Sequence, residues 1–147
     1  MTVPIDDHHL IEKVLSGEEL LGDGFLRVRR DTVLLPDGAQ STREYVVHNG
    51  AVMVVPLVDG PDGLRVVMER QYRHPIGKVV VEFPAGKREG SEDLLLCVQR
   101  ELREETGYLA REWAHAGVLH PLVAYSTEFI DLWFARGLVA GPRALDA

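Results

Sequence analysis

The stretch GKREGSEDLLLCVQRELREETGY, Gly86 to Tyr108, decides the fold because it contains the strongest helix pattern of the chain. Its apolar residues recur at helical spacing, at Leu94, Leu95, Val98 and Leu102. Ser91 can cap the helix N-terminus, and Gly107 can end the helix in a left-handed conformation. These features predict a helix over Glu92 to Thr106, preceded by a glycine-containing loop.

One face of this helix is unusually acidic. Glu101 lies beside Glu104 and Glu105, because residues three and four apart are neighbours on a helix. Each such like-charged pair costs roughly a few tenths of a kcal/mol. A divalent cation would neutralise the face, and oxygen-only ligands favour Mg²⁺, with Mn²⁺ as the alternative. The competing interpretation is an ordinary solvated face, since Arg100 can pair with Glu104.

The spacing of the whole stretch resembles the signature of the Nudix hydrolases, the Nudix box. The constrained positions are, in order, Gly86, Glu92, Arg100, Glu101, Leu102, Glu104, Glu105, Gly107 and Tyr108. The resemblance implies a loop–helix–loop whose glutamates hold metal ions against a substrate pyrophosphate. It also implies the fold: an α+β, Nudix-like α/β/α sandwich around a mixed central sheet.

Roles of individual residues follow from this resemblance. Glu101 and Glu105 are expected to be the principal metal ligands, with Glu104 close by and the carbonyl of Ala85 completing the set. Arg100 is expected to orient the glutamates, a task suited to its fixed fork of donors.

The glycines and the first glutamate of the box have supporting roles in the family. Glu92 is expected to fix the loop around the helix start. Gly86 is expected to lie at the substrate, where a side chain would hinder close approach.

The sequences flanking the box resemble the ADP-ribose pyrophosphatase branch. The resemblance runs through Arg43–Pro56, Glu69–Arg73, Val81–Lys87 and Pro121, and covers roughly residues 25 to 138. It implies hydrolysis of a nucleoside diphosphate linked to another moiety, first of all ADP-ribose, to AMP and ribose 5-phosphate. Alternatives are another nucleotide sugar, a dinucleoside polyphosphate, a damaged nucleotide, or a non-catalytic nucleotide-binding module.

Two arginines are candidate substrate-binding residues. Arg73 can hold phosphate oxygens with two hydrogen bonds, although it can instead pair with Glu69 or Glu82 on neighbouring strands. Arg43 is a candidate for the nucleotide end, with a surface strand arginine as the alternative.

Hydrolysis also requires a base to deprotonate the attacking water. In the resembling branch this base sits on a loop after the box, where Glu128 stands in this chain. Glu104 is the alternative base, and a surface glutamate without a role is the bland interpretation of Glu128.

The rest of the chain indicates a small mixed fold. Apolar runs bounded by turn residues predict strands over residues 25–35, 43–48, 51–58, 64–69, 79–83 and 129–135. A weaker helix is expected over Asp7–Ser16. Cys97 lies on the strong helix and is expected to pack rather than to react.

Composition limits the partners. The chain has 147 residues and a net charge of -7, without a basic cluster, so we expect no nucleic-acid partner. No apolar run is long enough for a membrane helix, and we expect a cytoplasmic protein with a nucleoside diphosphate sugar substrate.

Two segments are expected along the chain. Residues 1–45 form an N-terminal segment with strands and a dimerisation arm, and residues 46–147 form the catalytic domain. The resemblance implies a homodimer. It also leads us to expect a chain truncated at its C-terminus, because relatives continue beyond Gly137-Leu138 through further sheet and a helix.

Overall fold

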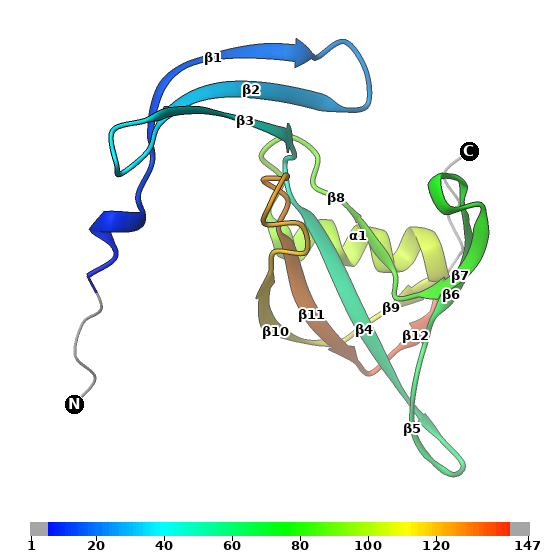
Figure 1. Cartoon of the computed structure of the whole chain (residues 1–147). Helices are drawn as coiled ribbons and strands as arrows, with labels where there is room; N and C mark the ends of the chain where they lie inside the picture. The colour runs from blue at the N-terminus through cyan, green and yellow to red at the C-terminus, as the bar shows by residue number, and fades with distance from the viewer. Residues whose placement is uncertain (1–5, 142–147) are drawn as a thin grey trace. The chain divides into compact units, whose positions relative to one another are not determined.

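A computed structural model describes residues 6–141. The start of the predicted N-terminal segment, residues 1–5, and the end of the predicted catalytic domain, residues 142–147, lie outside the described residues. The chain forms two compact units (Figure 1). Within the described residues, the N-terminal unit comprises residues 6–48 and 122–127. The second unit comprises residues 49–121 and 128–141; it contains the box and is called the catalytic unit after the role predicted for it.

The N-terminal unit is an antiparallel sheet of three strands in the order β1-β2-β3. Its strands are β1 (Lys13–Leu21), β2 (Arg27–Leu34) and β3 (Gln40–Val47). The predicted helix over Asp7–Ser16 is wrong, because only a short 3-10 turn, η1 (His8–Leu10), precedes β1. Pairing with β2 satisfies the backbone from Lys13 onward, and this tertiary pairing outweighs a weak local preference for helix.

The catalytic unit is built on a mixed sheet with the strand order β10-β11-β4-β5, in which β8 also pairs with β4. The strands are β4 (Ala51–Gly60), β5 (Gly63–Val66), β8 (Ala85–Lys87), β10 (Glu112–Leu119) and β11 (Ile130–Arg136). β11 runs parallel to β4 and the other pairs are antiparallel. The predicted α+β class with a mixed sheet is confirmed.

Two small strand pairs complete this unit. β6 (Glu69–Arg73) and β7 (Lys78–Glu82) form a hairpin through the 3-10 turn η2 (His74–Ile76). β9 (Tyr108–Leu109) pairs with β12 (Val139–Ala140). The sequence patterns did not predict β1 or β10, and the run predicted over residues 64–69 divides between β5 and the start of β6.

The helix α1 (Leu94–Thr106) lies against the sheet. It is the only α-helix among the described residues, 6–141. The cap residue is Asp93, not Ser91: its side chain accepts from the backbone N–H groups of Leu95 and Leu96 at 3.0 and 3.1 Å. Gly107 ends the helix as predicted, in the left-handed conformation with φ 74°.

The core lies between α1 and the sheet. Its fully buried members come from β4, β11 and α1, namely Val52, Val54, Ala135, Cys97, Val98 and Leu102. Replacing Leu102 by Ala would leave a cavity and cost about 2–5 kcal/mol. Burial of Cys97 confirms its packing role and raises the pKa of its thiol to about 12. No helix of residues 6–141 is long and apolar enough to cross a membrane.

Candidate active site

β8 brings the start of the box against the helix that ends it. β8 pairs with β4 through Gly86 and its neighbours, while α1 packs on the same strand. A Cβ atom at Gly86 would lie 1.9 Å from Cδ of Glu101. A side chain at position 86 would therefore displace the carboxylate of Glu101.

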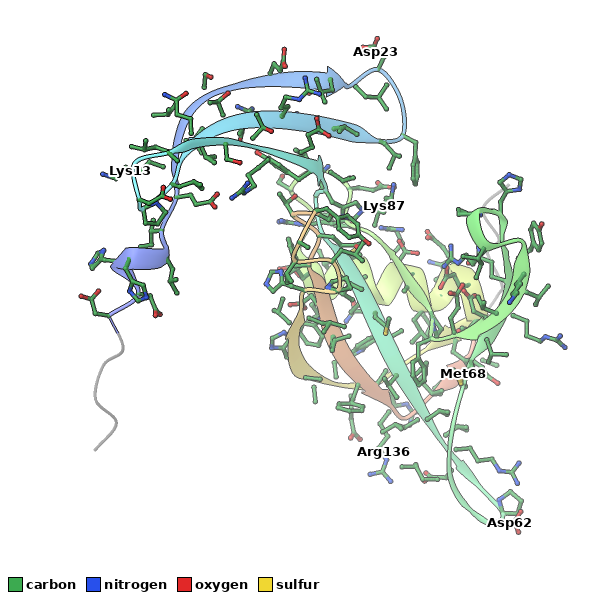
Figure 2. All side chains as sticks on the ribbon, in the orientation of Figure 1. Lys13, Asp23, Asp62, Met68, Lys87 and Arg136 are labelled. Atoms are coloured by element: carbon green, nitrogen blue, oxygen red, sulfur yellow. The ribbon has the colours of Figure 1, made fainter. Side chains whose placement is uncertain are left out.

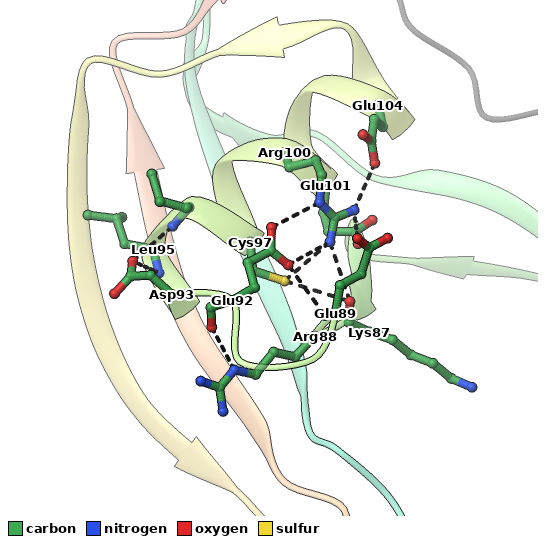
Figure 3. A network of polar contacts seen from close by, with 11 residues as sticks. Lys87, Arg88, Glu89, Glu92, Asp93, Leu95, Cys97, Arg100, Glu101 and Glu104 are labelled. Atoms are coloured by element: carbon green, nitrogen blue, oxygen red, sulfur yellow. Dashed lines mark hydrogen bonds and ion pairs between the residues drawn. The ribbon is translucent and has the colours of Figure 1, made fainter.

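Arg100 donates hydrogen bonds to three glutamates of the box (Figure 3). Its Nη1 donates to Glu101 Oε1 at 2.7 Å and to Glu104 Oε2 at 2.9 Å. Its Nη2 and Nε donate to the two oxygens of Glu92 at 3.0 and 3.1 Å. We call Arg100, Glu92, Glu101 and Glu104 the Arg100 network. One guanidinium thus holds three carboxylates, and the role of Arg100 in orienting metal ligands stays a prediction.

The electrostatics of this network follow from its contacts. Hydrogen bonding to Arg100 lowers the pKa of Glu92 to about 2. Burial raises the pKa of Glu101, whose exposed fraction is 8%, although Arg100 acts in the opposite direction. Glu101 is thus the member of the network most in need of positive charge.

Glu105 points the other way, toward the strand that carries Ala85. The backbone N–H of Ala85 donates to Glu105 Oε2 at 2.9 Å. Burial is the main cause that raises the pKa of Glu105 to about 7, and the nearby carboxylates of Glu69 and Glu101 raise it further. Burial therefore favours the protonated form of Glu105 more than that of an exposed glutamate.

The β6–β7 hairpin adds two carboxylates to this region. Glu69 and Glu82 face each other across the two strands, an arrangement of like charges that destabilises a sheet. Burial and then the Glu82 charge raise the pKa of Glu69. We call Glu69, Glu82 and Glu105 the Glu105 cluster. From the sequence, Glu69 and Glu82 were predicted only as partners of Arg73. The turn His74-Pro75-Ile76-Gly77 sets the hairpin register and was the sequence signal for their pairing.

The guanidinium of Arg73 forms an ion pair with Glu82 of this cluster. Its Nη2 lies 2.7 Å from Glu82 Oε1 and its Nε donates to Glu82 Oε2 at 3.2 Å. Oε1 is buried and lacks a partner with hydrogen-bond geometry. The pairing alternative for Arg73 is therefore realised, and its role toward substrate stays a prediction.

These residues fit a divalent cation by chemistry. The donors are oxygens alone, and Glu101 is buried while the others are half-buried. Burial is the main cause that raises the pKa values of Glu69, Glu101 and Glu105, and neighbouring carboxylates raise them further. Within residues 6–141, no group of three or more His, Cys, Asp or Glu side chains is already arranged to hold a metal ion. Glu101 and Glu104 both accept hydrogen bonds from Arg100. Glu101, Glu104, Glu105 and the Ala85 carbonyl stay the predicted ligands.

Glu128 lies just before β11 and interacts electrostatically with Lys87. Lys87, labelled in Figure 2, is the last residue of β8. Burial lowers the pKa of Lys87, and the Glu128 charge opposes that effect. The candidate base therefore neighbours the box loop. The alternative base, Glu104, is held by Arg100. Neither role is tested by these contacts.

Arg43 belongs to the N-terminal unit. Its Nη1 donates to the Ser41 hydroxyl at 3.1 Å and to the Thr42 carbonyl at 3.0 Å, and its Nη2 pairs with Glu12. These contacts are those of a strand arginine, and its assignment to the nucleotide stays a prediction.

Comparison with known proteins identifies the family. Residues 47–145 match the model described as NUDIX domain, more than half of the chain. The chain belongs to the Nudix family. Residues 12–46 of this Nudix protein match the model described as nucleoside diphosphate sugar hydrolase N-terminal domain. The family prediction made from the box is confirmed.

Curated relatives cover most of the Nudix chain. A methanol dehydrogenase activator of Bacillus methanolicus is 39% identical over 129 residues, which cover 86% of this chain and 67% of the relative. An ADP-ribose pyrophosphatase of Bacillus subtilis (strain 168) is 33% identical over 129 residues, which cover 88% of this chain and 68% of the relative. The chain spans about two thirds of the length of these two relatives.

A solved structure shares the fold. The crystal structure of an ADP compounds hydrolase aligns with a TM-score of 0.79 at 22% sequence identity, covering 92% of this chain and 71% of that chain. At this identity the likeness shows the Nudix fold alone, and the chemistry has to be argued from the residues of this chain.

Proposed function

We propose that this Nudix hydrolase cleaves the pyrophosphate bond of a nucleoside diphosphate linked to a sugar, with ADP-ribose as the first substrate and AMP and ribose 5-phosphate as products. The observation that carries the proposal is the set of box glutamates on α1: Arg100 holds Glu101 and Glu104, and Glu105 nearby has a raised pKa. A relative at 33% identity named ADP-ribose pyrophosphatase supports the choice of substrate.

The glutamates of α1 and Arg100 have different proposed roles. Glu101 and Glu105 would hold Mg²⁺, with Glu104 and the carbonyl of Ala85 beside them. When bound, the ion neutralises charge that develops on the phosphate oxygens and makes water more acidic. Arg100 keeps the glutamates in place through its planar fork of donors.

Two residues act on substrate and water. Arg73 would bind phosphate oxygens, exchanging its contact with Glu82 for the more negative ligand. Glu128 would accept the proton of the attacking water, which moves to its carboxylate as the bond from water oxygen to phosphorus forms and the pyrophosphate bond breaks.

A substrate panel tests the proposal. Purified protein is assayed for AMP release from ADP-ribose, an ADP-hexose, a dinucleoside polyphosphate and ATP, with Mg²⁺, with Mn²⁺ and with EDTA. We expect ADP-ribose to give the highest kcat/KM and EDTA to abolish turnover. Failure to cleave any of these linkages with either metal would refute the hydrolase proposal, and preference for another substrate would replace ADP-ribose.

Three finer properties belong to the same proposal. Mg²⁺ is proposed as the cofactor because the predicted ligands are oxygens alone. A homodimer is proposed from the family resemblance of the N-terminal segment, with its mass in solution as the test. The cytoplasm is proposed as the compartment because Cys97 is buried as a free thiol, a choice that cell fractionation can test.

A further inference from the structure

Arg73 and Glu82 form an ion pair within the β6–β7 hairpin, although they do not face each other in its register. Arg73 stands opposite Lys78, and Glu82 stands opposite Glu69. The side chain of Arg73 therefore runs back along the hairpin to reach Glu82, where its Nη2 lies 2.7 Å from Oε1 and its Nε donates to Oε2 at 3.2 Å. Two atoms of the guanidinium thus meet both oxygens of one carboxylate, a favourable arrangement for this pair of groups.

The Glu82 carboxylate depends on this partner. Its side chain is 24% exposed, against 46% for Arg73, and its Oε1 is buried. Glu69 stands opposite Glu82 with a charge of the same sign. If Arg73 left, a half-buried carboxylate would remain opposite a second one, which is unfavourable. The free protein therefore favours the state in which Arg73 is bound to Glu82.

The same guanidinium lies close to the proposed reaction centre. Burial raises the pKa values of Glu69 and Glu105, and the charge of Arg73 acts in the opposite direction on both. Arg73 is therefore within electrostatic range of Glu105, a box glutamate proposed to hold Mg²⁺. One cation is thus placed between the needs of Glu82 and those of a phosphate that binds at this centre.

We infer that Glu82 is a positioning residue that sets the affinity for substrate: it holds the guanidinium of Arg73 and competes for it with the substrate phosphate. This inference rests on the proposed function, in which Arg73 exchanges Glu82 for phosphate oxygens. Glu82 acts through Arg73. A ligand that binds only the released state of Arg73 loses affinity in proportion to how strongly the free protein favours the paired state.

Glu82→Gln tests the competition in ADP-ribose hydrolysis. Glutamine keeps the length of the side chain and one acceptor oxygen but lacks the charge. We expect KM to fall by roughly two- to fivefold, the ratio that corresponds to an ion pair at a partly exposed position, with a smaller change in kcat. Glu112→Gln makes the same substitution on exposed β10 and serves as the matched control with parental KM.

A double-mutant cycle separates competition for Arg73 from simple repulsion of an anionic substrate. Arg73→Gln removes the guanidinium and is expected to lower kcat/KM, because the phosphate loses its partner. If Glu82 acts through Arg73, then adding Glu82→Gln to Arg73→Gln changes kcat/KM by less than about twofold. If Glu82 acts by repulsion, the gain of the single Glu82→Gln variant persists in this background.

Thermal unfolding is measured for each variant, and Glu82→Ala replaces Glu82→Gln if the latter does not unfold cooperatively. An active parent protein whose KM is unchanged or raised by the substitution would overturn the inference, and so would a gain that persists without Arg73. Failure of both position-82 variants to fold would overturn it as well, because Glu82 would then be required for the fold. An inactive parent protein would instead refute the proposed function.

Discussion

The Arg100 network and the Glu105 cluster are both anchored on α1, yet they balance their charges in opposite ways. In the network, one guanidinium binds three carboxylates, and the pKa of Glu92 falls to about 2. In the cluster, burial and like charges raise the pKa of Glu105 to about 7. The difference indicates that Arg100 compensates the charge of Glu92 within the network, whereas Glu101 and the cluster keep raised pKa values that a cation from solution would lower.

Glu105→Gln is expected to have the largest effect, because it removes a proposed metal ligand from the uncompensated cluster. We expect kcat to fall by roughly 100- to 1,000-fold, the usual cost of removing one strong electrostatic group from a reaction centre. Steady-state kinetics across a Mg²⁺ titration measures it. Glu112→Gln, on exposed β10, is the control and should retain parental kcat. Near-parental turnover of Glu105→Gln at saturating Mg²⁺ would remove the distinction between the two groups.

Arg100→Lys tests whether the network is a frame. A lysine keeps the positive charge but lacks the planar fork that reaches three carboxylates. We expect kcat/KM to fall by roughly 10- to 100-fold, as for other residues that orient metal ligands, and the Mg²⁺ requirement to rise. Equal kinetics for the lysine variant would mean that charge alone, not geometry, is what Arg100 supplies.

The pH dependence of stability sharpens the comparison in the metal-free protein. The pKa of Glu105 is about 7 when folded, against 4.5 ordinarily. Between these values the folded state retains a proton that the unfolded state has lost, so the unfolding free energy falls as pH rises. The contribution is fully present below pH 4.5 and is lost through pH 7.

Thermal unfolding in EDTA from pH 4.5 to pH 8 measures this slope. The parent protein should lose stability relative to Glu105→Gln across the window, and added Mg²⁺ at pH 8 should raise the unfolding temperature of the parent more than that of the variant. Parallel curves for the two proteins would contradict the raised pKa of Glu105.

Glu69→Gln is expected to have the smallest effect of these variants, and it is expected to stabilise the folded protein. It removes one of two like charges that face each other across the β6–β7 hairpin. We expect the metal-free protein to gain about 0.2–1 kcal/mol in unfolding free energy, measured by urea titration. The control is Glu112→Gln, which makes the same substitution at a position that faces Arg136 across β10 and β11. Because its partner carries the opposite charge, this variant should not gain unfolding free energy. Destabilisation by Glu69→Gln would show that the hairpin charges are already compensated.

Local pattern was sufficient for α1 and its glycines. The apolar stripe through Val98 and Leu102 is buried as the periodicity predicts, and Gly107 ends the helix. The cap shifted from Ser91 to Asp93, because both residues can accept at a helix N-terminus and local preference does not separate them. Helix boundaries are therefore less secure than helix existence.

The strands β1 and β10 could not be predicted from local sequence patterns, because pairing with distant strands defines them. β1 is exposed along its length and has no alternation to read, so only its partner β2 defines it. β10 is likewise mostly exposed and is defined by β11. Strand propensity depends on neighbours across the sheet, which a linear pattern does not contain.

The candidate site divides in the same way. The spacing of the box by itself determined the family and put Arg100 beside Glu104, because both lie on one helix. Only the tertiary structure decided that Glu69 lies opposite Glu82 and that the charge of Glu69 acts on Glu105. The physical reason is that a helix fixes contacts three and four residues apart, whereas burial, like-charge proximity and strand pairing arise only once distant segments meet.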